Sequence, residues 1–137
     1  NSILTNELTS INQYFLHARL YDNWGYKKLG KKTYDESIEE MKHADVLIKR
    51  ILFLEGLPNV QNLLKMNIGE KPEECLAADL DRVDQIREKS KDFVSRNMLR
   101  VILDDTEEHI DFLETQLALV SSVGLQNYLQ SMMGELE

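Results

Sequence analysis

The feature that most constrains the fold is a segment without helical periodicity, residues 57–71, between two long amphipathic segments. Fully extended, about fifteen residues at ~3.3 Å each reach ~50 Å, which is enough to run the length of a helical bundle. A turn between neighbouring antiparallel helices does not need so long a connection. We therefore expect a long crossover that makes the second and third helices parallel to each other.

Helical periodicity covers most of the remaining chain. The expected helices span residues 1–24, 33–55, 72–90, 92–120 and 125–129. Residues 30–33 are interpreted as a turn with Thr33 as the cap of the second helix, and Gly56 followed by Pro58 supplies its end. The sequence thus predicts an all-α fold, a four-helix bundle with a long crossover between the second and third helices and a short C-terminal fifth helix.

The expected third helix is too short for its neighbours. At ~1.5 Å per residue it is ~28 Å long, whereas the second and fourth helices are nearer ~35 to 45 Å. Either one end of the bundle is left uncovered, or residues are missing from the third helix.

Composition predicts one domain, residues 1–137. A hydrophobic content of 42% in 137 residues is ordinary for a chain that buries a sizeable core. The single cysteine, Cys75, excludes an internal disulfide. Because the sequence shows neither a membrane-length apolar run nor a secretory leader, the expected compartment is the reducing cytoplasm.

The net charge of −8 argues against binding to the phosphate backbone of nucleic acids, which requires clustered Lys and Arg. Two interpretations of this charge stay open. It can simply keep the surface solvated, or it can create a field that attracts cations.

Two histidines and two glutamates fall on the expected core faces. Glu40 and His43 lie three residues apart and share one face of the second helix, His109 lies on the apolar line of the fourth, and Glu7 lies beside the apolar stripe of the first. A buried carboxylate must be paired, protonated or metal-bound. Oxygen and nitrogen ligands suit iron or manganese better than a thiolate-seeking metal. The alternatives are a Glu7 that reaches solvent near its helix start and histidines that are hydrogen-bonded core residues.

Other side chains have simpler interpretations. His17, with Tyr14 and Phe15 beside it, is expected to be structural. Met41 is rotated one residue from Glu40 and therefore points away from the bundle interior. It is either a packing residue or part of a contact between subunits.

Several segments resemble bacterioferritin, and together they cover nearly the whole chain. They are Asn6-Glu7-Leu8, residues 11–19 (INQYFLHAR), residues 40–45 (EMKHAD), residues 50–59 (RILFLEGLPN), residues 108–111 (EHID) and residues 124–129 (GLQNYL).

The resemblance implies a cytoplasmic iron-storage cage of 24 ferritin-like subunits. Each subunit would bind Fe(II) at an intrasubunit di-iron centre, oxidise it with oxygen or hydrogen peroxide, and pass ferric mineral to the cavity. Glu7, Glu40, His43 and His109 match the family's metal ligands, and these residues would act in its ferroxidase reaction. Met41 matches the ligand of a haem b held between paired subunits, and a ferredoxin-type reductant is a further partner that the resemblance admits.

The chain departs from the family at two ligand positions. Thr106 stands where the family's second Glu-x-x-His motif has its bridging glutamate. The next residue, Glu107, is rotated by about 100° around the helix from that position, so it is a poor substitute. If the chain is aligned with the family forward from residue 68, Val83 stands where the family has the glutamate of its third helix. If it is aligned backward from residue 96, the third helix is several turns shorter than in the family. The alternative function is therefore a haem-carrying structural subunit with an incomplete ferroxidase site, which co-assembles with a competent subunit. The third interpretation is a helical bundle whose histidines are only core residues. The sequence does not decide whether the cage is homomeric or mixed, or which oxidant is preferred.

Overall fold

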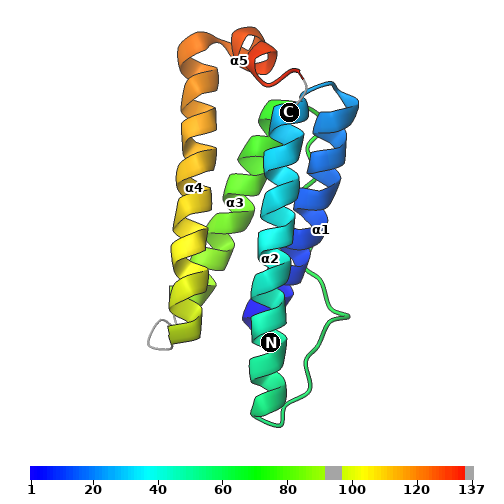
Figure 1. Cartoon of the computed structure of the whole chain (residues 1–137), viewed down its shortest axis with the longest axis vertical. Helices are drawn as coiled ribbons and strands as arrows, with labels where there is room; N and C mark the ends of the chain where they lie inside the picture. The colour runs from blue at the N-terminus through cyan, green and yellow to red at the C-terminus, as the bar shows by residue number, and fades with distance from the viewer. Residues whose placement is uncertain (92–96, 135–137) are drawn as a thin grey trace.

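The computed structural model describes residues 1–91 and 97–134, except for the side chains of residues 91 and 97–99. Its helices are α1 (Ser2–Asn23), α2 (Lys27–Phe53), α3 (Pro72–Lys91), α4 (Asn97–Val123) and α5 (Leu125–Ser131). Figure 1 shows the long helices α1 to α4 side by side, with α5 across one end. The described part of the chain contains no strand, so the predicted all-α bundle is confirmed. None of its helices is both long and apolar enough to cross a membrane.

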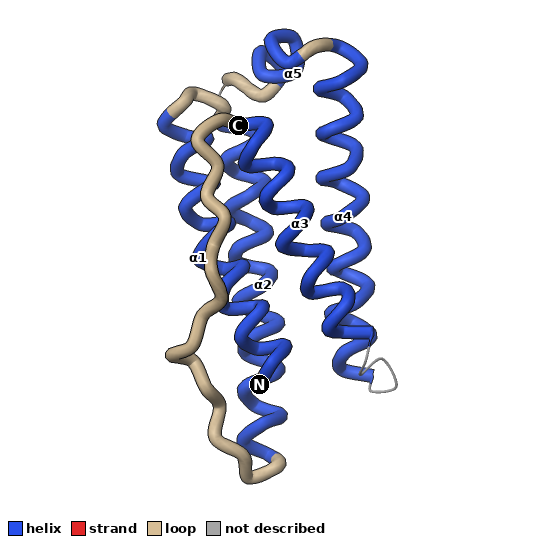
Figure 2. Tube along the Cα trace, turned by 180° about the vertical axis from the view of Figure 1, so that it is seen from behind, coloured by secondary structure: helices blue, strands red, loops and turns tan. Residues whose placement is uncertain are grey.

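The crossover, residues 54–71, connects opposite ends of the bundle. Figures 1 and 2 show that it leaves the lower end of α2 and runs back along α1 to the upper end, where α3 begins. As a result α2 and α3 run in the same direction, as the aperiodic segment predicts.

Side chains from one face of α1 hold the crossover. The backbone N–H groups of Leu64, Asn67 and Gly69 donate to Thr9 Oγ1 (2.9 Å), Gln13 Oε1 (3.1 Å) and His17 Nε2 (3.1 Å), respectively. These acceptors are spaced by four residues along α1, so they share one face of the helix. Because Nε2 of His17 accepts a hydrogen bond, its Nδ1 carries the proton and donates to Asp79 Oδ1 at 2.7 Å. His17 therefore has the structural role expected from the sequence.

The start of α2 differs from the prediction. The chain turns at residues 24–26, and α2 begins at Lys27 rather than near Thr33, which is buried inside the helix. Gly30 lies within α2 because the two helices approach closely at this point. A Cβ at residue 30 would meet the carboxylate of Asp22 and would lie 3.1 Å from the carbonyl oxygen of Ala18. The glycine thus permits close packing and does not mark a turn.

The end of α2 falls one residue earlier than Gly56 suggests. Glu55 adopts the left-handed conformation, with φ 62°. The N–H of Glu55 donates to Leu52 O at 3.0 Å, and the N–H of Gly56 donates to Ile51 O at 2.9 Å. This pair of hydrogen bonds is the Schellman motif, formed here with a glutamate in the position that glycine usually occupies.

The core consists of two apolar clusters. The upper cluster contains Tyr21, Leu29, Cys75, Leu76, Val83, Ile110, Leu113 and Tyr128. The lower cluster contains Ile3, Leu4, Ala44, Leu47 and Ile102. Buried polar residues at positions between these two sets, among them Glu7, Glu40 and Thr106, form a layer that we call the polar layer.

The length mismatch between the helices is confirmed. The α3 helix has 20 residues, against 27 in α2 and 27 in α4. At the lower end of α2, Phe53 is 74% exposed, so this end of the bundle is uncovered in the isolated chain. Phe15, which lies beside the structural His17 in sequence, is 47% exposed and packs edge-on against Tyr34. Of the predicted fourth helix, residues 92–96 and the side chain of Leu99 lie outside the described residues.

Gly69→Ala tests the attachment of the crossover to α3. A Cβ at residue 69 would lie 2.5 Å from the backbone nitrogen of Cys75 and 2.8 Å from its Sγ, so the backbone must shift. We expect the free energy of unfolding to fall by about 1–3 kcal/mol, as for other overpacked sites. Chemical denaturation measures this loss, with the exposed Lys65→Ala as the control that should change stability by less than about 0.5 kcal/mol. Equal stabilities of the two variants would contradict the expectation.

Candidate metal centre

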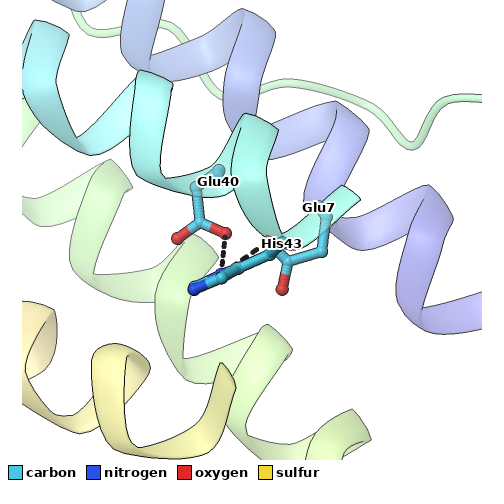
Figure 3. Close-up of side chains that lie close together, drawn as sticks. All are labelled: Glu7, Glu40 and His43. Carbon is cyan, nitrogen blue, oxygen red and sulfur yellow. Dashed lines mark hydrogen bonds and ion pairs between the residues drawn. The ribbon is translucent and has the colours of Figure 1, made fainter. Parts of the chain in front are cut away.

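Three predicted ligands meet in the polar layer. Nδ1 of His43 lies 3.3 Å from Glu40 Oε2 and 3.6 Å from Glu7 Oε2. Figure 3 shows the imidazole of His43 next to both carboxylates, with Glu7 coming from α1 and the other two residues from α2. One ligand atom from each residue falls within 4.8 Å of the others. All three side chains are buried, so this group is a candidate site for a metal ion.

A second group lies beside the first and shares Glu40 with it. It joins Glu36 and Glu40 of α2 to His109 of α4, again with one ligand atom from each residue within 4.8 Å. Nδ1 of His109 is 3.6 Å from Glu36 Oε2. Among the described residues, these two groups are the ones whose geometry could hold a metal, and a shared carboxylate can bridge two ions.

Asp105 of α4 orients His43. The Nε2–H of His43 donates to Asp105 Oδ2 at 2.7 Å, which leaves Nδ1 facing Glu7 and Glu40. Burial by itself would lower the pKa of His43, but hydrogen bonds and charges from Glu40 and Asp105 outweigh it and raise the pKa to about 9. A carboxylate behind a histidine in this way fixes its tautomer and increases its basicity toward a metal.

Several atoms of the polar layer are poorly satisfied by the protein. Both carboxylate oxygens of Glu7 are buried without a hydrogen bond, and so is Nδ1 of His109. Burial, with a smaller contribution from Lys32, lowers the pKa of His109 to about 3, so its imidazole is neutral. Burial also raises the pKa of Glu40. Unsatisfied buried groups cost free energy, and a bound dication would offset that cost.

The four ligands predicted from sequence are thus divided between two adjacent groups. Glu7, Glu40 and His43 lie in one, and His109 lies with Glu40 in the other. Sequence reasoning did not select Glu36 as a ligand, although it precedes Glu40 by one helical turn on the same stripe. It also missed Asp105, whose position one turn before His109 gave no sign that it faces α2.

Thr106 and Val83, the residues at the two positions that depart from the family's ligand set, contribute no carboxylate. Thr106 is completely buried, and its Oγ1 donates to Ile102 O at 2.7 Å. Val83 is completely buried in the upper apolar cluster. Met41, by contrast, is 51% exposed, so its predicted direction away from the bundle interior is confirmed.

Comparisons with known proteins agree with the helical architecture. A family model described as a ferritin-like domain matches residues 1–123. The chain is 46% identical to the bacterioferritin of Brucella melitensis biotype 1, over 95% of this chain and 87% of the relative. It is also 46% identical to the bacterioferritins of Rhodobacter capsulatus, over 93% of this chain and 86% of the relative, and of Streptomyces coelicolor, over 96% and 84%.

Metal affinity should rise with pH. With a pKa of about 9, the His43 imidazole holds at pH 7 a proton that a metal ion must displace from Nδ1. We expect Co(II) affinity to increase about tenfold per pH unit from about pH 6.5 to about pH 8.5 and to level off near the pKa. Calorimetry in buffers of different ionisation enthalpy counts the released protons. In Asp105→Asn the pKa of His43 should fall, and the plateau should begin at lower pH. Constant affinity across this range would contradict the expectation.

Proposed function

The chain belongs to the bacterioferritin family of ferritin-like proteins, and on that premise we propose that it is an iron-storage subunit that oxidises Fe(II) at a di-iron centre inside its own bundle. In this proposal, subunits assemble into a cage in the cytoplasm, and the ferric product is stored as mineral in the cavity. The observation that carries the proposal is the carboxylate of Glu40, which belongs to two adjacent buried groups of oxygen and nitrogen donors.

The donor set fits iron. Glu7, Glu40, His43 and His109 offer carboxylate and imidazole ligands without a thiolate, since the cysteine of the chain, Cys75, lies in the upper apolar cluster. A bound dication would also compensate the buried carboxylate of Glu7, whose two oxygens have no hydrogen-bond partner within the protein. We assign Glu40 as the bridging ligand, with Glu7 and His43 on one side and His109 on the other.

The reaction needs two Fe(II) at a time. Each Fe(II) gives up one electron, and one O2 takes the two electrons with two protons to form H2O2. With H2O2 as the oxidant, the same two electrons and two protons give two waters. Glu40 would hold both ions, and His43 would bind through Nδ1 while its Nε2–H stays directed at Asp105. The oxidised ions then move to the cavity of the cage.

Met41 is the proposed haem ligand. Its thioether lies at the surface, 51% exposed, on the side of α2 that points away from the metal groups. Met41 would hold a haem b at this position together with a methionine from another subunit. The surface position of Met41 fits such a shared site.

One observation favours the alternative function, a haem-carrying structural subunit with little ferroxidase activity. Thr106 and Val83 stand at two ligand positions of the family and carry no carboxylate. Among the described residues, α3 supplies no ligand to either metal group. If the centre holds only one ion, the subunit would co-assemble with a competent partner.

Rapid mixing of the purified protein with Fe(II) and oxygen separates the two functions. We expect a fast oxidation phase that saturates at two Fe(II) per chain, and we expect Glu40→Gln to slow this phase at least about tenfold because the bridging charge is lost. Asp45→Asn is the control, since Asp45 is an exposed carboxylate of the same helix that pairs with Lys49 at 3.1 Å. A wild-type protein without a fast phase would favour the structural subunit.

Haem binding is tested independently of iron oxidation. We expect the Soret band that develops on titration with haemin to be lost in Met41→Leu, since leucine keeps the volume of the side chain but offers no ligand. Met66→Leu, at an exposed methionine of the crossover, should bind haem like the wild type. Haem binding by Met41→Leu at wild-type affinity would remove Met41 from the site, whatever the result of the Fe(II) experiment.

A further inference from the structure

We infer that Glu36 is a metal ligand of the second iron position, where it takes the place of the carboxylate that α4 lacks at Thr106. This inference rests on the proposed di-iron function and specifies how the second ion is held. The ligands of that position would be Glu36, the shared Glu40, and His109.

Glu36 continues the ligand stripe of α2. Residues 36, 40 and 43 are separated by four and three positions, so their side chains lie on one face of the helix over two turns. The carboxylate of Glu36 reaches to 3.6 Å from Nδ1 of His109. A single helix thereby supplies three ligands, and the bridging residue Glu40 lies between the other two in sequence.

His109 provides the independent sign of a ligand. Its side chain is 4% exposed, and its Nδ1 faces the Glu36 carboxylate without a hydrogen bond. The ring packs edge-on against Tyr14, with the centroids 5.1 Å apart, which fixes its orientation.

The geometry of α4 explains why the carboxylate must come from α2. Thr106 directs its Oγ1 back to Ile102 O, and the side chain of Glu107 lies 3.8 Å from Arg87. Neither residue belongs to the metal groups of the described chain. The position next to His109 is occupied instead by Glu36, across the interface between α2 and α4.

Glu36 is held by an exchangeable cation. Its carboxylate pairs with Lys32 Nζ at 3.2 Å, and the side chain of Lys32 is 44% exposed. Glu36 also lines a cavity of about 220 Å³ together with Asp35, Glu39, Asp105 and Glu108. A dication at this position would compete with the half-exposed ammonium group of Lys32 for the Glu36 carboxylate.

Co(II) titration of the full-length protein tests the inference without redox chemistry. We expect wild type to bind two Co(II) per chain, measured by calorimetry and by the visible d–d bands. Glu36→Gln should bind one, with the affinity for the second at least about a hundredfold lower after loss of a charged ligand. Glu39→Gln removes the same charge from the same cavity, but Glu39 is in neither metal group, so this control should still bind two ions.

The other outcomes distinguish this inference from the proposed function. Two Co(II) bound equally well by wild type and Glu36→Gln would overturn the role of Glu36 and leave the di-iron function standing. One Co(II) in wild type, lost in Glu7→Gln and retained in Glu36→Gln, would also overturn it. No Co(II) in wild type would refute the di-iron centre itself. Since Glu36 is partly exposed, an unchanged circular dichroism spectrum of Glu36→Gln is expected and shows that the loss is local.

Discussion

The structure depends on a layer of buried charge between two apolar clusters. Glu7 and Glu40 are almost inaccessible to solvent, and neither oxygen of Glu7 has a hydrogen bond. The imidazole of His43 lies within 3.3 to 3.6 Å of both, and the low-dielectric surroundings strengthen its attraction to them. A core with this content is less stable than an apolar core of the same volume unless a cation is bound. The free energies of folding and of metal binding are therefore coupled in this protein.

The same layer joins α2 to α4. In the described part of the chain, the ion pairs between these helices are His43 with Asp105 and His109 with Glu36. Each pair links a carboxylate of one helix to an imidazole of the other, so a bound ion would be held by both helices. Among the described residues, the short α3 supplies no ligand to either metal group, and its Val83 belongs to the upper apolar cluster. The centre thus uses α1, α2 and α4, with α2 supplying most of the donors.

Sequence reasoning failed where a residue type has two structural uses. Gly30 was interpreted as part of a turn, but it permits the close approach of α1 and α2 near Ala18. The helix-ending conformation fell on Glu55, one residue before the glycine that usually adopts it. Glu36 was not selected as a ligand, because helix spacing shows that its side chain shares a face with Glu40 but not which residue lies opposite. For Gly30 and Glu36 the deciding contact comes from another segment of the chain.

The sequence by itself determined the relations inside each helix. Spacings of three and four residues place Glu40 with His43 and turn Met41 outward, because the geometry of an α-helix is fixed. It also determined the parallel arrangement of α2 and α3, since the length of residues 57–71 spans the bundle. Only the tertiary structure decided that Asp105 faces His43 and that Glu36 faces His109. These pairings depend on the axial offset and rotation of α4 against α2, which result from the packing of the whole core and are not encoded in any one segment.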